Sequence, residues 1–389
     1  MRTPKSKAWA EIDLSALAGN YNAVVKEVKK HSADAKVIAV VKADAYGHGA
    51  KECVKTLAKS GCEMFAVSSA SEAIDVRKVT DKDVLILGYT PCEEADILAC
   101  GNITQTVMSL DYARDLDSAV REYKAKGKMP ENAKLKVHIK LDTGMNRIGF
   151  GTHDITALVS DVLAVSKLPN LEIAGMFTHF ACADSDEGRN AVTAEQTARY
   201  MRAKAALEEA GLTFGMCHIC NSAGAMYLPD SYMDAVRAGI ILYGASPSGN
   251  IGEAAKFTPV MTLKTLVAQV HEVKAGETVG YGAAYKAEKD MTVATLAVGY
   301  ADGFIRAFAN GGTVRLSDGT DAKLCGRICM DQCMVDVSGR RVKQGDEVIL
   351  FGGDDGTMLE NLAAAAGTIN YELLCLVGKR VDRKYIRKK

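Results

Sequence analysis

The sequence predicts an α/β protein in which an N-terminal (β/α)8 barrel of the TIM type is followed by a mostly β domain. Eight short runs rich in Val, Ile and Leu lie between residues 36 and 244, and stretches with helical spacing separate most of them. Such apolar strands, alternating with helices, require a parallel sheet covered on both faces. Eight strand-helix units fit a (β/α)8 barrel. After residue 250 the pattern changes to short alternating strands.

The eight predicted barrel strands share a high content of branched apolar residues, and they cover 36–44, 63–69, 83–89, 102–108, 134–142, 171–179, 213–220 and 234–244. Stretches such as SSASEAIDVRKV and TAEQTARYMRAKAALEEAG have the spacing of amphipathic helices. A doubly wound open sheet is the alternative. No G-x-G-x-x-G turn follows a first strand, so the barrel is favoured.

A cluster of Pro, Gly and Ser at 246–257 predicts the boundary between the two domains, 1–250 and 251–389. The second domain is expected to contain strands within 260–273, 291–298, 312–328, 333–339 and 346–352. One helix is expected near 358–367. The basic tail, 379–389, is interpreted as a solvated terminus.

Charge and hydropathy exclude several classes of protein. The 48 Lys and Arg residues balance 48 Asp and Glu, so the formal net charge is zero. This balance gives no basic surface for nucleic acid or an anionic membrane. No apolar run approaches the roughly 20 residues that span a bilayer, and the first residues lack the apolar core of a signal peptide. We therefore expect a cytoplasmic protein.

The eleven cysteines are interpreted as free thiols of a reducing compartment. Two clusters, Cys217 with Cys220 and Cys325 with Cys329 and Cys333, could suggest metal or redox pairs. Both lie in apolar or strand-like segments, and no second pair has zinc-ribbon spacing. We interpret them as buried small hydrophobic residues and expect no metal site.

Polar residues gather where the predicted barrel strands end, which is the face that carries the active site in such barrels. Lys42 directly follows the apolar run VIAVV. Burial disfavours the lysine cation, and a neutral amine is what a Schiff base with an aldehyde cofactor requires. The alternative is a lysine that extends from the strand end into solvent.

A phosphate site is predicted in the loops after the last two strands. Asn221 and Ser222 open a helical run, and Gly239 with Ile240 follows Arg237. Backbone N–H groups in such loops bind phosphate in many barrels. An ordinary helix N-cap is the alternative for the Asn-Ser pair. A lysine for aldehyde chemistry together with a phosphate site indicates pyridoxal 5′-phosphate (PLP).

Several blocks of the sequence together resemble the alanine racemase family. They occur in order from AWAEIDLSAL to INYE and include AVVKADAYGHGA, KLDTGMNRIGF, MFTHFACAD, HICNSAGA, VRAGIILYG, VGYGAAY, VGYADGFIR, GRICMDQ and TINYE. The resemblance implies PLP as cofactor, alanine as substrate and a supply of D-alanine for peptidoglycan. It also implies a homodimer in which each active site borrows residues from the partner's β domain.

The resemblance implies two catalytic residues, Lys42 and Tyr281, which act on opposite faces of the substrate Cα. Lys42 would also hold PLP covalently. Further cofactor-binding residues would be Tyr46, Arg147, His179, Ser222, Arg237, Gly239, Ile240 and Tyr371. The substrate pocket would contain Arg147, Met330 and Tyr300. His179 would assist Tyr281 and connect it to Arg237 and His218.

The resemblance also implies particular electrostatic roles for Arg237 and for a further residue, Lys140. Arg237 would lie at the pyridine nitrogen of PLP, where a permanently protonated guanidinium disfavours ring protonation and so limits transamination. Lys140 would place a second cation near Arg147. The resemblance implies that CO2 carbamylates Lys140 and makes it an anion. An unmodified lysine directed to Asp142 or to solvent is the alternative.

Three other functions would share part of this set of residues. A PLP racemase of broader specificity, for serine or other amino acids, would share most of these residues, although Tyr371 favours alanine. A PLP decarboxylase would not need Tyr281, and its ring-nitrogen partner is normally acidic. A non-catalytic PLP carrier would resemble the barrel alone. The segment RVDR at Arg380 departs from the more usual RVPR of the family.

Overall fold

The computed structural model describes residues 6–185, 187, 189–249, 258–354 and 356–388. The chain divides into two compact units. One, the barrel unit, comprises residues 21–45 and 53–242, and the other, the β unit, comprises residues 1–20, 46–52 and 243–389. The boundary that the sequence predicts at 250/251 lies outside the described residues.

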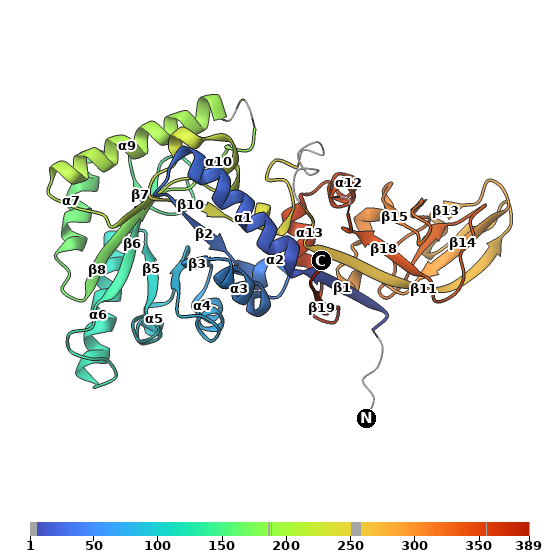
Figure 1. Ribbon diagram of the computed structural model, residues 1–389, viewed down its shortest axis with the longest axis horizontal. Helices are drawn as coiled ribbons and strands as arrows, with labels where there is room; N and C mark the ends of the chain where they lie inside the picture. Colours follow the sequence, from blue (N-terminus) through green and yellow to red (C-terminus); the bar gives the residue numbers. More distant parts are fainter. Residues whose placement is uncertain (1–5, 186, 188, 250–257, 355, 389) are drawn as a thin grey trace. The chain divides into compact units, whose positions relative to one another are not determined.

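Eight parallel strands of the barrel unit form one nearly closed sheet (Figure 1). In spatial order these strands are β10 (Ala235–Ala238), β2 (Lys36–Val40), β3 (Met64–Val67), β4 (Asp83–Ile86), β5 (Ile103–Val107), β6 (Leu135–Asp142), β8 (Leu171–Phe177) and β9 (Met216–His218). A ninth, short strand, β7 (Phe150–Gly151), pairs in parallel with one of them, β6. The Asp234 N–H donates to the Cys217 carbonyl at 3.0 Å, which joins the two ends of the sheet. All eight predicted strands are confirmed.

Helices cover the outside of these strands (Figure 1). They are α1 (Leu14–His31), α3 (Ala50–Lys59), α4 (Ala70–Arg77), α5 (Ala95–Cys100), α6 (Leu110–Ala125), α7 (Ile155–Ser166), α9 (Ala194–Glu209) and α10 (Ser222–Tyr227). Four of them begin after a residue whose side chain accepts a hydrogen bond from the first turn: Ser69, Ser109, Asp154 and Asn221. Nowhere in the described ranges is a helix both long enough and apolar enough to span a membrane.

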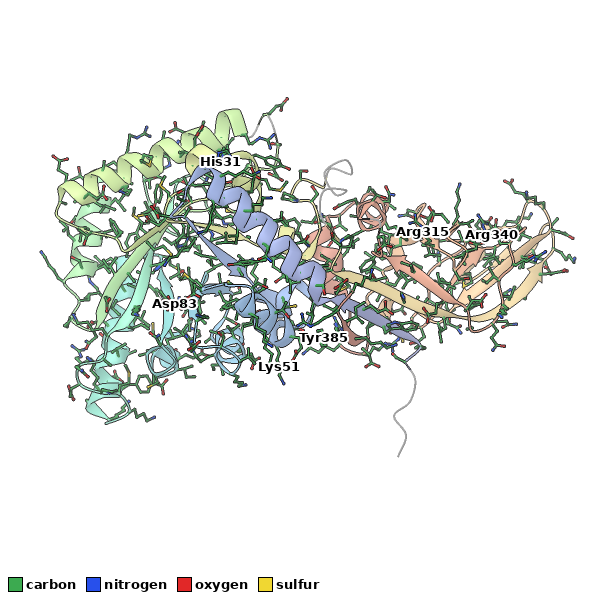
Figure 2. The ribbon with its side chains drawn as sticks, in the orientation of Figure 1. His31, Lys51, Asp83, Arg315, Arg340 and Tyr385 are labelled. Atoms are coloured by element: carbon green, nitrogen blue, oxygen red, sulfur yellow. The ribbon has the colours of Figure 1, made fainter. Side chains whose placement is uncertain are left out.

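The sheet of the β unit is organised by one long strand, β11 (Met261–Val273). It pairs antiparallel with β1 (Ala8–Asp13), β14 (Met291–Leu296) and β18 (Glu347–Phe351). The remaining strands of this sheet are β15 (Thr313–Arg315), β16 (Asp321–Lys323), β17 (Cys333–Asp336) and β19 (Asp382–Ile386). Every segment in which the sequence predicts a strand after residue 258 contains one. Arg315 and Arg340, labelled in Figure 2, both donate hydrogen bonds to Asp321.

Three expectations for the ends of the chain are corrected. Residues 8–13 were assigned to the barrel domain, but β1 belongs to the sheet of the β unit. The basic tail is no solvated terminus, because β19 pairs in parallel with β1. The Lys384 ammonium lies 4.0 Å from the centre of the Trp9 ring, and this cation–π contact stabilises the pairing of β19 with β1. Besides α12 (Thr357–Ala366), a second helix, α13 (Asn370–Leu376), follows.

All eleven cysteines lie in the described ranges, and they are free thiols. Cys217, Cys220, Cys325 and Cys333 are buried, as expected. Cys329 is partly exposed, so the interpretation as a buried residue is wrong for it. Burial raises the pKa of Cys220 and Cys325 to about 12. Among the described residues no group of three His, Cys, Asp or Glu side chains could hold a metal ion.

Candidate active site

Positive charges surround His179 at the carboxyl ends of the barrel strands. Burial is the main reason why the pKa of His179 lies well below its usual value. The charges that add to this shift are, in decreasing order, those of Arg237, Lys140, Arg147 and Lys42. The structure therefore brings five of the predicted site residues together and keeps the His179 imidazole neutral.

Lys42 begins a left-handed turn, α2 (Lys42–Tyr46). The φ angles of the four residues that follow it lie between 52° and 56°. A left-handed conformation costs roughly 1–2 kcal/mol for each residue with a side chain. Such strain persists only where surrounding contacts determine it, and it is typical of functional sites. The lysine itself is half-buried at the end of β2.

The Arg237 guanidinium is 2% exposed and donates only to neutral acceptors. Nη1 donates to His218 Nδ1 at 2.6 Å and to the His218 carbonyl at 3.1 Å. Nη2 donates to the carbonyls of Thr178 and Ile219 and lies 3.3 Å from His179 Nδ1. In the part of the chain that the structure describes, no carboxylate pairs with Arg237. Burial lowers its pKa to about 10, so it remains a cation at neutral pH without an anionic partner.

Lys140 is 3% exposed inside the barrel. Its Nζ donates to the Leu141 carbonyl at 2.9 Å and lies 5.3 Å from the centre of the Phe177 ring. Burial first, and the charge of Arg237 second, lower the pKa of Lys140 to about 7. A large fraction of Lys140 is therefore a neutral amine near neutral pH.

Asp142 accepts no hydrogen bond from Lys140 and instead organises the loop after β6. Its carboxylate accepts hydrogen bonds from the N–H groups of Gly144 and Asn146 at 3.0 Å and of Arg147 at 3.1 Å. These three bonds fix the backbone that carries the Arg147 side chain. Asp142 does oppose the pKa shift of Lys140 through its charge.

The predicted phosphate-binding residues of the barrel unit meet after β9 and β10. The Gly239 N–H donates to the Ser222 hydroxyl oxygen at 2.9 Å. Ser222 is the first residue of α10, whose cap is the Asn221 side chain. Ile240 begins a 3-10 turn (Ile240–Tyr243). A hydroxyl and backbone N–H groups at the starts of two helical turns suit an anion.

The other two predicted phosphate ligands, Tyr46 and Tyr371, lie in the β unit. Their ring centres are 6.2 Å apart, and Tyr46 also packs against Tyr243 at 4.9 Å. Burial raises the pKa of Tyr46 far above its usual value, so its hydroxyl stays protonated and can donate. The following Gly47 has a φ of 79°, and a Cβ there would lie 2.3 Å from the Leu374 carbonyl oxygen.

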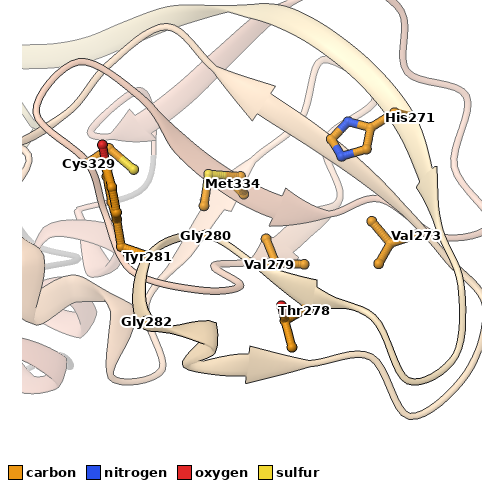
Figure 3. Close-up of a pocket in the computed structure, with 9 residues that line it drawn as sticks. All are labelled: His271, Val273, Thr278, Val279, Gly280, Tyr281, Gly282, Cys329 and Met334. Carbon is orange, nitrogen blue, oxygen red and sulfur yellow. The ribbon is translucent and has the colours of Figure 1, made fainter.

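Tyr281 occupies the turn between two short strands of the β unit, β12 (Thr278–Val279) and β13 (Tyr285–Lys286). Its side chain is 70% exposed. It lines an open cavity of about 530 Å³. Figure 3 shows the residues of this lining, which are Tyr281, His271, Val273, Thr278, Val279, Gly280, Gly282, Cys329 and Met334. A Cβ at Gly282 would lie 2.6 Å from Arg327 Nη1, so this arginine supports the turn closely.

Tyr300 and Met330, the two predicted substrate-pocket residues of the β unit, lie on adjoining loops. The Tyr300 N–H donates to the Cys329 carbonyl at 3.0 Å, and the Ala301 N–H donates to the Met330 carbonyl at 3.1 Å. Tyr300 is 42% exposed and Met330 is 53% exposed. Backbone bonds therefore hold both exposed side chains on one surface.

Arg380 links these same two loops to the C-terminal segment. Its Nε donates to Asp302 Oδ1 at 2.6 Å, and its Nη2 donates to Asp331 Oδ1 at 2.5 Å. Asp302 is buried, and its second oxygen accepts the Gly299 N–H at 2.9 Å. The unusual RVDR segment thus keeps an arginine that clamps the loops of Tyr300 and Met330.

Sequence reasoning missed two residues of the barrel site. Glu72 binds the backbone of the left-handed turn through the Ala43 N–H at 2.7 Å. His138 lies 3.0 Å from His218, ring nitrogen to ring nitrogen, and is 3% exposed. A signal for His138 existed, because it precedes Lys140 by two positions in one strand and so shares its face. No local pattern indicates the contact of Glu72.

The barrel has a lysine after its first strand and polar residues at its strand ends, which is the architecture of a (β/α)8-barrel enzyme. Residues 12–247 match the family model of the alanine racemase N-terminal domain, and residues 260–385 match that of the alanine racemase C-terminal domain. The chain belongs to the alanine racemase family. The resemblance found in the sequence is thus confirmed.

Relatives of known name agree over nearly the whole chain. An alanine racemase of Clostridium novyi is 41% identical over 97% of this chain and 95% of its own. The solved structure of the Clostridium difficile alanine racemase is 38% identical, with a TM-score of 0.86 over 99% of this chain and 97% of its own. The Bartonella henselae alanine racemase, solved with covalently bound pyridoxal phosphate, is 29% identical, with a TM-score of 0.85 over 98% of this chain and 100% of its own.

Proposed function

We propose that the protein is a PLP-dependent alanine racemase that interconverts L-alanine and D-alanine. The observation that carries this proposal is the buried Arg237, a cation without an anionic partner in the described residues, beside a group that includes Lys42. The named relatives support alanine as substrate, and the Bartonella henselae neighbour supports a covalently bound cofactor. A non-catalytic carrier is disfavoured because the C-terminal domain is present.

The residues of the site fit PLP by their chemistry. Basic side chains near His179, among them Arg237 and Arg147, suit a ligand with a phosphate and a phenolic oxygen together with a substrate carboxylate. PLP, when bound, withdraws electrons from the substrate and makes its Cα proton acidic. We assign cofactor binding to Lys42, Tyr46, Arg147, His179, Ser222, Arg237, Gly239, Ile240 and Tyr371. Arg147 would also bind the substrate carboxylate, and Met330 and Tyr300 of a second copy of the chain would complete the pocket.

Racemisation requires proton transfer at both faces of the substrate Cα. We assign one face to the Lys42 amine and the other to the Tyr281 hydroxyl, so that one group removes the proton and the other returns one. Arg237 would direct an N–H donor at the pyridine nitrogen. Because the guanidinium keeps its proton, that nitrogen stays unprotonated and the side reaction of transamination is limited.

We propose a homodimer with shared active sites, and the exposure of Tyr281 supports it. In the single chain its side chain is 70% exposed, as are large parts of Tyr300 and Met330. An acid or base works best in a site from which water is excluded. A second copy of the chain would provide that enclosure. Sedimentation of the purified protein should therefore give a dimer, and a fully active monomer would contradict this assignment.

Carbamylation of Lys140 is supported by its neutral fraction near pH 7. The neutral Nζ would attack the carbon of CO2, forming an N–C bond and releasing one proton, so that an anion replaces a cation beside Arg147. Asp142 is bound to backbone N–H groups and does not pair with Lys140. Protein equilibrated with 13C-labelled CO2 should show one carbamate carbon signal that Lys140→Met removes.

The free thiols fit a reducing cytoplasm, which is where we place the protein. Its product there would be D-alanine for peptidoglycan. The interaction partners on this view are alanine and a second copy of the chain, with no role for nucleic acid or a membrane.

The decisive experiment is incubation of PLP-loaded protein with L-alanine in heavy water. Optical rotation and deuterium at Cα are followed together. Rotation that decays to zero while deuterium enters Cα supports the two-base racemase, and Tyr281→Phe should then mainly lose one direction of proton transfer. Exchange with retained chirality would overturn the role of Tyr281. No change at all, despite bound PLP, would overturn alanine as substrate and favour another amino acid, such as serine.

A further inference from the structure

Three buried side chains form a row through the barrel interior: Arg237, His218 and His138. Arg237 Nη1 lies 2.6 Å from His218 Nδ1, and His218 Nε2 lies 3.0 Å from His138 Nδ1. Their exposed fractions are 2%, 0% and 3%. His138 therefore sits two hydrogen bonds away from the nitrogens of Arg237.

The donors and acceptors along this row can be assigned from chemistry. A guanidinium only donates, so His218 Nδ1 must accept and carries no proton. A neutral imidazole then carries its proton on the other nitrogen, and His218 Nε2 donates to His138 Nδ1. Each hydrogen bond fixes the next, and the row has one direction, from Arg237 to His138.

Both histidines are held neutral. Burial, followed by the charge of Arg237, lowers the pKa of His218 well below its usual value. The same two causes lower the pKa of His138 to about 4. A protonated His218 would direct an N–H at the Arg237 guanidinium, which the 2.6 Å contact cannot accommodate.

The ring of His138 is held in place by packing. A Cβ at Gly175 would lie 2.6 Å from both Cε1 and Nε2 of His138, so the ring lies directly against the backbone of β8. The His218 ring stacks on Phe177 at 4.8 Å with an angle of 17° between the planes. Neither imidazole can rotate freely, and the acceptor Nδ1 of His138 stays opposite His218 Nε2.

We propose that His138 is a positioning residue. It accepts the hydrogen bond of the His218 Nε2 proton and thereby stabilises the His218 tautomer that accepts the Arg237 hydrogen bond and orients the guanidinium. This inference rests on the proposed function only where it takes Arg237 to face PLP. Without an acceptor at position 138, the His218 proton would be buried at Nε2 without a partner, and the Nδ1–H tautomer would become competitive. That tautomer cannot accept the Arg237 hydrogen bond.

The first test uses the full-length protein without PLP. Nitrogen-15 NMR of histidine-labelled protein, with His218→Gln to assign the signal, reports which His218 nitrogen carries the proton. We expect the proton on Nε2. A proton on Nδ1, or on both nitrogens at pH 7, would overturn the proposal. Because this measurement needs neither cofactor nor substrate, it stands apart from any failure to racemise alanine.

The second test compares two variants. His138→Asn places an amide oxygen where Nδ1 was and keeps an acceptor, whereas His138→Leu removes it. We expect His138→Asn to keep the Nε2–H tautomer and kcat/KM within about threefold. We expect His138→Leu to lose roughly tenfold, because the Nδ1–H tautomer of His218 cannot accept the Arg237 hydrogen bond, and a hydrogen bond to a charged group is worth about that factor. His138→Leu should also release more pyruvate for each racemisation, a change that loss of packing alone would not cause.

Equal kcat/KM, tautomer and pyruvate yield in the two variants would refute the role of His138. If His138→Leu does not fold, His138→Asn still decides, because a proton on His218 Nδ1 in that variant would contradict the proposal. If the wild-type protein fails to racemise alanine but has the expected tautomer, the proposed function fails and the role of His138 in orienting Arg237 remains.

Discussion

The Glu72 carboxylate accepts a hydrogen bond from the Ala43 N–H at 2.7 Å, although the two residues are 29 positions apart. Its second oxygen accepts the Ser68 N–H, also at 2.7 Å. One side chain at the start of α4 thus holds both the left-handed turn after Lys42 and the end of the neighbouring strand. Four left-handed residues are costly, so an anchor of this kind is needed to keep Lys42 in place.

Glu72→Ala is expected to lower the free energy of unfolding by about 1–3 kcal/mol, because two exposed hydrogen bonds worth about 0.5–1.5 kcal/mol each are lost. The variant should also retain PLP less well, measured as absorbance after gel filtration. Asp75→Ala is the matched control on the same helix, where an exposed ion pair with Lys78 is worth at most about 1 kcal/mol. Equal PLP retention in both variants would show that Glu72 does not position Lys42.

The stability of the CO2-free protein should depend on pH through Lys140. Its pKa is about 7 in the folded state and 10.5 when exposed. Between these values the unfolded chain binds the proton and the folded chain does not, so the free energy of unfolding rises with pH, by up to about 1.4 kcal/mol per pH unit. Below pH 7 both states are protonated and this slope vanishes.

Urea unfolding at several pH values between 7 and 10 measures this contribution as the difference between wild type and Lys140→Met. The variant should lose the slope. Lys78→Met, which removes an exposed lysine, should keep it. A slope that is identical in wild type and Lys140→Met would contradict the lowered pKa.

Gly47→Ala should destabilise the protein more than Gly61→Ala. Both glycines have positive φ, 79° and 95°, so each alanine costs roughly 1 kcal/mol of backbone strain. At Gly61 nothing lies within 4 Å of the added Cβ, whereas at Gly47 the Leu374 carbonyl oxygen lies 2.3 Å away. The melting temperatures of the two variants separate the cost of backbone strain, which both share, from the cost of the steric clash at Gly47. Equal melting temperatures would mean that the backbone near Leu374 moves aside at little cost.

Arg380→Gln should raise KM for alanine more than it lowers kcat. The reason is that the loops of Tyr300 and Met330 lose the bonds from Arg380 to Asp302 and Asp331, while the proposed proton-transfer residues, Lys42 and Tyr281, are unchanged. Arg315→Gln is the control, because Arg315 (Figure 2) pairs with Asp321, another carboxylate of the same unit. A fall in kcat alone would count against a role of Arg380 in shaping the substrate pocket.

The eight barrel strands and most strands of the β unit could be predicted because their signals are local. A strand buried on both faces must be apolar along its length, and a helix start needs a short polar cap such as Ser69 or Ser109. Polar residues at the ends of most barrel strands, among them Lys42 and Arg237, could be assigned to one face because parallel strands end at the same edge.

The sequence by itself therefore determined the barrel, its order and the residue types at its active face. Only the tertiary structure decided that the two ends of the chain pair, since β1 and β19 meet from positions that are hundreds of residues apart and carry no mutual pattern. The tertiary structure also determines that Arg237 pairs with neutral groups, that Glu72 binds the turn after Lys42, and that the pKa of Lys140 is lowered. Burial and charge depend on neighbours in space, and those are set only when the chain has folded.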